Sequence, residues 1–127
     1  MKLRNLALAA ALNLGIALCA FAAVAADYPT PKVGDYIATD FRFSTGEVMP
    51  ELKLHYTTIG EPTGEPILIL HGTAGSGTGL LTPAFAGEIF GVGQALDAKK
   101  YFVIIPDALG AGKSSKPSDG LKGKFPK

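Results

Sequence analysis

The chain has 127 residues, of which 47% are hydrophobic, and its 12 basic and 11 acidic residues leave a net charge of +1. This balance gives no strongly basic surface, so we expect no nucleic-acid partner. Cys19 is the only cysteine, which excludes an internal disulfide and a thiolate metal site. We therefore expect stability to come from packing, and we expect no metal.

Residues 1–26 have the pattern of an export signal, because two basic residues precede an apolar stretch from Leu6 to Val24 and small residues close it. The pattern favours cleavage after Ala26, or after Ala25. The remaining residues, 27–127, are then expected to form one periplasmic or secreted domain. An uncleaved membrane anchor of similar length is the alternative, and it is the sole membrane contact that we expect.

Two stretches alternate between apolar and polar residues, as half-buried β-strands do. In Tyr36–Phe43, one face carries Ile37, Thr39, Phe41 and Phe43. In Leu52–Thr57, the apolar face alternates with a polar face that includes His55, which we expect to be an exposed strand residue. Residues 44–47 have turn chemistry, so the two strands are predicted to form an antiparallel hairpin.

Two later stretches are apolar on every side, Ile67–Leu70 and Tyr101–Ile105, and such runs are typical of parallel strands covered on both faces. Between them, Thr82 and Pro83 have the pattern of a cap and first-turn proline of a helix that ends before Gly91. The order of strand, helix and strand predicts an α/β fold with a parallel crossover.

A glycine-rich loop follows each apolar strand, His71–Gly79 and then Asp107–Ser115. Glycines at such positions let backbone N–H groups approach a ligand closely. The end of the second loop, Gly112-Lys113-Ser114, is similar to a phosphate-binding loop, but Asp107 stands where the first glycine is required. The loop fits the pattern D-x-x-G-x-G-x-S better, so a phosphate-loop protein is the least favoured of our predictions.

Together, the two loops resemble those of the α/β-hydrolase superfamily, with His71-Gly72 after one strand and Pro106-Asp107 and its glycines after the next. More narrowly, three segments are similar to the homoserine O-acetyltransferase branch: Glu51–Leu54, His71–Gly75 and Leu96–Val103. The resemblance implies the N-terminal part of an α/β-hydrolase fold, namely an antiparallel hairpin followed by a strand-helix-strand crossover. It also implies the spatial strand order 1-2-4-3, with the edge of the third strand open and able to self-associate.

The resemblance implies acyl chemistry on a serine nucleophile, in which backbone N–H groups stabilise the oxyanion. It assigns one such donor to the backbone of Thr73, and it makes His71 and Gly72 the residues that shape the oxyanion turn. The implied substrate of the complete enzyme is a small-molecule acyl ester. No cofactor is expected, apart from acetyl-CoA as the acyl donor if the protein is a transferase.

The nucleophile pattern G-x-S-x-G does not occur in these 127 residues, since no serine has glycine two positions away on both sides. We therefore expect a truncated N-terminal part of an exported acyl hydrolase or acyltransferase that lacks the catalytic triad and is inactive alone. The alternative is an exported, non-catalytic module that binds a ligand or a partner chain.

Overall fold

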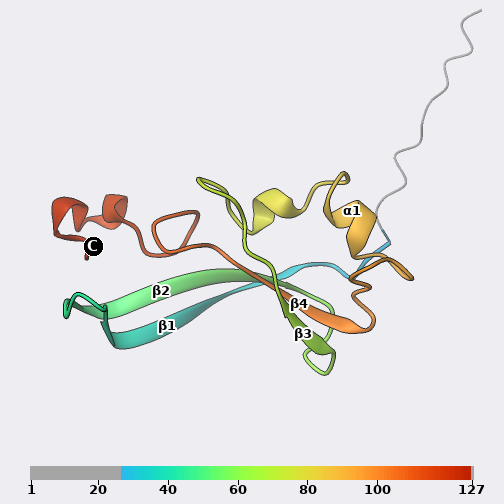
Figure 1. Ribbon diagram of the computed structural model, residues 1–127, viewed down its shortest axis with the longest axis horizontal. Helices are drawn as coiled ribbons and strands as arrows, with labels where there is room; N and C mark the ends of the chain where they lie inside the picture. Colours follow the sequence, from blue (N-terminus) through green and yellow to red (C-terminus); the bar gives the residue numbers. More distant parts are fainter. Residues whose placement is uncertain (1–26, 127) are drawn as a thin grey trace, which may run out of the picture.

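The computed structural model describes residues 27–126, so the predicted signal peptide lies outside the described residues. Four strands form one mixed, open sheet in the order β1-β2-β4-β3 (Figure 1). β1 (Lys32–Arg42) and β2 (Val48–Ile59) form the predicted antiparallel hairpin. β4 (Tyr101–Pro106) lies antiparallel to β2 and parallel to β3 (Glu65–Leu68), so the expected α/β-hydrolase strand order is confirmed.

The hairpin closes where the turn was predicted, because Phe43 donates its N–H to the carbonyl of Glu47 at 2.9 Å and accepts from Gly46. The predicted buried face of β1 is wrong, however, since Ile37 is 43% and Phe41 is 41% exposed. Among the described elements, β1 packs chiefly against β2. The alternating pattern therefore identified a strand correctly, but its apolar face stays partly exposed among residues 27–126.

β3 starts two residues earlier than predicted, and it is not covered on both faces, because Leu68 is 63% and Leu70 is 70% exposed. The strand lies at the edge of the sheet, where one side has no neighbour among the described strands. The N–H groups that bond β4 belong to alternate residues such as Glu65 and Ile69. The backbone of Pro66 and Leu68 consequently faces outward, and Pro66 has no N–H to offer there.

The predicted helix shrinks to a single turn, α1 (Ala86–Ile89). Its start resembles the prediction, since the Thr82 hydroxyl accepts a hydrogen bond from the N–H of Phe85 at 3.2 Å. Gly87 lies inside the turn and Gly91 follows it, and each glycine in a helix costs about 1 kcal/mol relative to alanine. This glycine content explains why the helical spacing of the apolar residues does not extend the helix.

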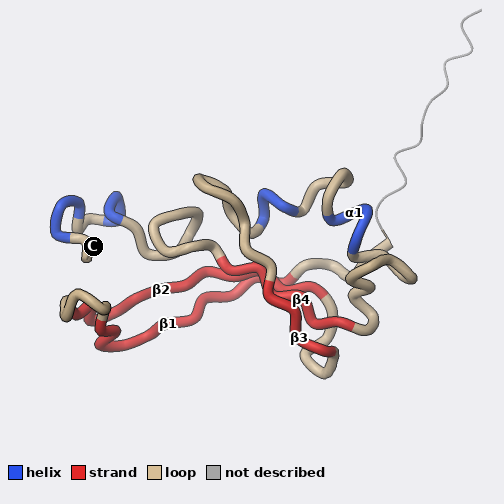
Figure 2. Tube along the Cα trace, in the orientation of Figure 1, coloured by secondary structure: helices blue, strands red, loops and turns tan. Residues whose placement is uncertain are grey.

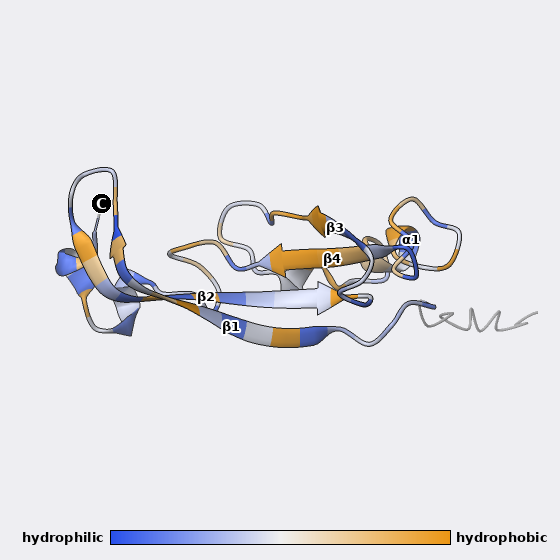
Figure 3. Cartoon of the chain, turned by 90° about the horizontal axis from the view of Figure 1, so that it is seen from below, coloured by the Kyte–Doolittle hydropathy of each residue, from blue (hydrophilic) through white to orange (hydrophobic). Residues whose placement is uncertain are grey.

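One face of the sheet carries the core, with α1 and the loops beside it above β4 (Figures 1 and 2). Phe90 is fully buried there, and its ring meets the rings of Tyr28 and Phe85 edge-on at 5.9 and 6.1 Å. β3 and β4 are the most hydrophobic strands (Figure 3). The buried cluster consists of Ile59, Ala86, Phe90, Ala98, Val103 and Ile105.

The other helical segments of residues 27–126 are three short 3-10 turns, η1 (Thr78–Leu80), η2 (Pro117–Asp119) and η3 (Lys122–Lys124). η2 and η3 follow the second glycine loop and lie near the end of β2 that joins the hairpin turn (Figure 1). Within residues 27–126, no helix has the length and apolar character needed to span a membrane.

Candidate functional site

The two glycine-rich loops face each other across an open depression of about 550 Å³. One wall is the segment from His71 to Ala74, which follows β3, and the other is Ala108 to Ala111, which follows β4. Both loops therefore leave the carboxyl ends of parallel strands, the edge where α/β proteins bind their ligands. The sequence-predicted site residues thus lie together at one place.

The first wall is a tight turn over residues 72–75, closed by a hydrogen bond of 3.0 Å from the Gly75 N–H to the Gly72 carbonyl. Its third residue, Ala74, has a φ of 59°, whereas Thr73 does not have a positive φ. This combination is typical of a type II turn, with Thr73 at its second position. Among the described residues, no group accepts a hydrogen bond from the N–H of Thr73.

His71 joins the two walls through its ring. Its Nε2 accepts a hydrogen bond from the N–H of Ala108 at 2.9 Å, and its Nδ1 lies 2.7 Å from the carbonyl of Gly72. The ring must therefore be neutral with its proton on Nδ1, because Nε2 accepts and Nδ1 donates. This arrangement fits a residue that shapes the turn.

Asp107 joins the same loops below the depression, and sequence reasoning missed this role. Its buried carboxylate accepts the N–H of Gly77 at 2.6 Å and the N–H of Lys113 at 2.7 Å. Burial raises the pKa of Asp107, but the two N–H donors, together with the nearby His55 and His71, lower it by more, so the pKa lies below the ordinary value of 3.8. The charge of Asp107 is therefore compensated within the loops.

Two glycines make room for this carboxylate. A Cβ at Gly112 would collide with Asp107 Oδ2, and the φ of +52° at Gly112 independently favours glycine. A Cβ at Gly77 would lie 2.7 Å from the carbonyl of Ile105 and 3.4 Å from Asp107 Oδ1. One glycine of each loop, Gly77 and Gly112, thus makes room for the aspartate, and Lys113 gives its N–H to that aspartate instead of to a phosphate.

The serines that end this pattern bind the free edge of β2. The buried Ser114 hydroxyl accepts the N–H of His55 at 2.9 Å and donates to the carbonyl of Asp107 at 2.7 Å. Ser115 accepts the N–H of Lys53 through its hydroxyl and donates its own N–H to the Lys53 carbonyl. Neither serine lies in the nucleophile pattern G-x-S-x-G. Both instead provide hydrogen-bond partners for the backbone of β2.

His55 is buried, with 7% exposed, so its predicted exposure is wrong. Its Nδ1 lies 2.6 Å from Asp35 Oδ1 on the neighbouring strand, in register with it. Its Nε2 is buried and has no partner among the described residues. The loop bearing Ser114 reaches β2 at this position from 59 residues away, which local alternation could not reveal.

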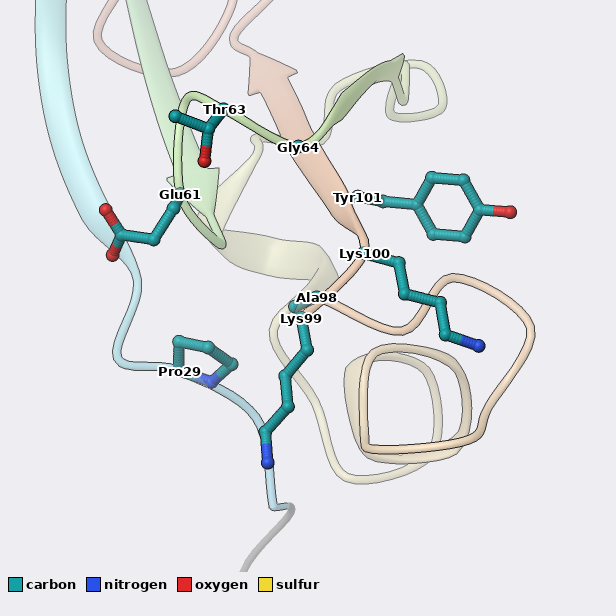
Figure 4. Close-up of a pocket in the computed structure, with 8 residues that line it drawn as sticks. All are labelled: Pro29, Glu61, Thr63, Gly64, Ala98, Lys99, Lys100 and Tyr101. Carbon is teal, nitrogen blue, oxygen red and sulfur yellow. The ribbon is translucent and has the colours of Figure 1, made fainter.

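A second depression, of about 350 Å³, lies where β3 and β4 begin and includes Gly64, Lys99 and Tyr101 (Figure 4). Figure 4 shows the ring of Tyr101 and the chain of Lys100 pointing away from Glu61. Polar groups do not converge on one point, which a ligand site requires. The depression between the glycine loops therefore remains the candidate site.

No protein-family model matches the chain. It is 34% identical over 98 residues to homoserine O-acetyltransferase of Haloferax prahovense, covering 67% of this chain and 24% of that protein. Its fold matches a crystal structure of homoserine O-acetyltransferase from Staphylococcus aureus with a TM-score of 0.62 and 24% identity, over 77% of this chain and 30% of that one. An acetylester hydrolase from Corynebacterium glutamicum matches with a TM-score of 0.55 and 26% identity, over 68% and 24%.

The chain spans about a quarter of the length of the curated relatives it matches. Over that quarter, the sequence identity and the strand order both support the relationship that the two glycine-rich loops indicate. The resemblance is therefore confirmed: over this part of their length, the chain is similar to the α/β-hydrolase-fold proteins of the homoserine O-acetyltransferase branch.

Proposed function

We propose that this chain contributes one oxyanion donor, the backbone N–H of Thr73, to an exported acyl hydrolase or acyltransferase that uses a serine nucleophile. The observation that carries the proposal is the turn over residues 72–75. It lies at the carboxyl ends of β3 and β4, beside an open depression, and the Thr73 N–H has no acceptor among the described residues. An N–H fixed in this way can bind the negative oxygen of a tetrahedral intermediate.

The rest of the depression suits this role. Its walls are formed by Gly and Ala residues together with His71, Thr73 and Leu109, so a small acyl group can approach the backbone closely. His71 acts in this proposal as a positioning residue, because both ring nitrogens are occupied by loop backbone. No cofactor enters the proposal, although acetyl-CoA would be the acyl donor of a transferase.

The chain is proposed to be inactive alone, because an oxyanion donor without a nucleophile and base gives far less acceleration than a complete triad. Ser76, the serine nearest the site in sequence, is engaged within its own turn, where its hydroxyl accepts the N–H of Gly79 at 3.2 Å. A hydrolysis assay of the full chain with p-nitrophenyl acetate should therefore show only the spontaneous rate. Robust turnover that disappears in Ser76→Ala or His71→Ala would contradict the proposal and locate a different site.

The oxyanion role is tested in an active context by a chimera. Residues 35–127 would replace the matching segment of the Thermobifida fusca homoserine O-acetyltransferase, to which this chain is 35% identical over 91 residues. Thr73→Pro then removes the N–H, while proline suits the second position of a type II turn. We expect kcat to fall by about 10²–10³-fold, the usual effect of losing one oxyanion donor.

Thr73→Ala is the matched control for the chimera, because it keeps the N–H and removes only the side chain. It should retain most of the kcat. Equal losses in the two variants would assign the effect to the side chain or to the turn, and an inactive unmodified chimera would contradict the proposed contribution of this chain.

A further inference from the structure

The two loops of the depression are joined by two sets of hydrogen bonds, an outer one made by the His71 ring and an inner one made by the Asp107 carboxylate. At the depression itself, the His71 ring accepts the N–H of Ala108 at 2.9 Å. Beneath it, the Asp107 carboxylate accepts the N–H groups of Gly77 and Lys113 at 2.6 and 2.7 Å. The hydrogen bond to His71 joins the loops at their exposed surface, and the hydrogen bonds to Asp107 join them where they are buried.

The hydrogen bonds to His71 and to Asp107 depend on pH in different ways. Nε2 of His71 can accept the Ala108 N–H only while the ring is neutral, because a protonated ring has N–H groups at both nitrogens. The bond from Nδ1 to the Gly72 carbonyl survives protonation, since Nδ1 donates in either state. Adding one proton to the ring therefore breaks one hydrogen bond and sets two N–H donors against each other.

We propose that the depression carries a pH-dependent latch, in which protonation of His71 releases Ala108 and separates the turn over residues 72–75 from the opposite wall. Asp107 keeps the bases of the loops together while this happens. The latch opens the depression at the wall that bears Thr73, and it closes the depression again when the ring loses its proton.

The charged groups around the ring are few. The segments 72–79 and 108–112 contain no ionisable side chain, and neither does the strand segment 66–70 that precedes His71. The carboxylate of Asp107 interacts electrostatically with His71 and with His55, and His55 is paired with Asp35.

Histidine is the side chain that ordinarily changes charge between about pH 5 and 8. The lowered pKa of Asp107 keeps its carboxylate ionised across this whole interval. The hydrogen bond from Ala108 to His71 can therefore break while the hydrogen bonds from Gly77 and Lys113 to Asp107 remain. The inference rests on the geometry of the loops and not on the proposed acyl chemistry.

The test is an NMR titration of the uniformly ¹⁵N-labelled full chain from about pH 8 to 5, the histidine range. The bond between Ala108 and His71 joins two nitrogens, so it transmits a scalar coupling between the amide nitrogen and Nε2. We expect this coupling at the upper pH, and we expect it to vanish as the His71 ring resonances report protonation. The Ala108 amide should shift with the same midpoint, while the Gly77 and Lys113 amides stay in place.

Three results would overturn the latch: no coupling at the upper pH, an Ala108 amide that ignores the titration of His71, or Gly77 and Lys113 amides that move with it. His55 serves as the internal control, since the Ala108 midpoint must follow the ring of His71 and not that of His55. In the variant His71→Asn the pH response of Ala108 should disappear, and its persistence would contradict the proposal. The wild-type coupling decides the matter if that variant does not fold, and no readout depends on substrate.

Discussion

Asp107 shows how one buried carboxylate can organise two loops. It receives two short hydrogen bonds from backbone N–H groups that belong to different loops, Gly77 and Lys113. Hydrogen bonds to a charged acceptor contribute about 1.5–3 kcal/mol, more than those between neutral groups. The glycines around it are the structural requirement for placing the carboxylate there.

We expect Asp107→Asn to lower the free energy of unfolding by about 1.5–3 kcal/mol at neutral pH, because an amide NH₂ would face one of the two N–H donors. Since the folded-state pKa of Asp107 is lowered, its contribution is complete above the ordinary value of 3.8 and is lost as the pH falls through the folded value. Urea unfolding at several pH values should show the difference shrinking below about pH 4. Glu88→Gln, an exposed site on α1, should change nothing, and a difference that persists unchanged in strong acid would contradict this account.

Single residues also mark where sequence reasoning stopped. The loop that holds His71 and Thr73 could be predicted from its glycines and from the apolar run that it follows, whereas the roles of the two residues were implied only by the resemblance. His55 could not be placed correctly, because its burial depends on Ser114, which comes from a distant loop. The role of Asp107 was missed for a similar reason, since one of its two partners, Gly77, lies in the other loop, which only the folded sheet brings close.

At the level of elements, the end of β2 is held by side chains where β4 no longer pairs with it. The β2–β4 ladder runs to Tyr56 and Pro106, and beyond it the hydroxyls of Ser114 and Ser115 bond the backbone of His55 and Lys53. A strand edge with unpaired backbone groups is a liability, and burial makes it costlier. The D-x-x-G-x-G-x-S loop thus completes the sheet.

Ser114→Ala should destabilise the chain by about 1–3 kcal/mol, because it leaves the His55 N–H without its buried acceptor. Ser115→Ala is the matched control: its site is less buried, and the bond from its N–H to the Lys53 carbonyl remains. The measurement is urea unfolding followed by circular dichroism. Equal losses in the two variants would contradict the assignment of the buried hydroxyl.

The elements themselves were predictable to different degrees. The hairpin and the parallel pairing of β3 with β4 followed from alternation and from apolar runs, which depend on nearby residues. The helix was too long in the prediction, because apolar spacing was weighed without the cost of Gly87. The boundaries of β3 shifted because Glu65 and Pro66 pair with β4 despite their poor strand propensity.

For the whole molecule, the open edge at β3 is the main consequence of the strand order. Leu68 and Leu70 are largely exposed there, and the hydrophobic strand has a neighbour on one side among the described strands. An exposed apolar edge favours association between chains. This surface is also where the alternative function, a partner-binding module, would operate.

We therefore expect concentration-dependent self-association of the full chain in sedimentation velocity, and we expect Leu68→Lys to reduce it, because a lysine on an edge strand opposes pairing. Leu121→Lys is the control, since Leu121 is also exposed, at 43%, but lies outside the sheet. A wild-type chain that stays monomeric at every concentration, or an equal effect of both substitutions, would contradict this expectation.

Pro66 decides which register such an association can use. A strand added outside β3 would find a carbonyl but no N–H at Pro66. Leu68, two residues further along β3 and facing the same side, offers both groups. A full pair of backbone hydrogen bonds is therefore available at Leu68 and not at Pro66, which favours pairing that extends from Leu68 toward His71. This pairing lies at the end of β3 that leads into the turn over residues 72–75, so a chain that extended the sheet there would also border the depression.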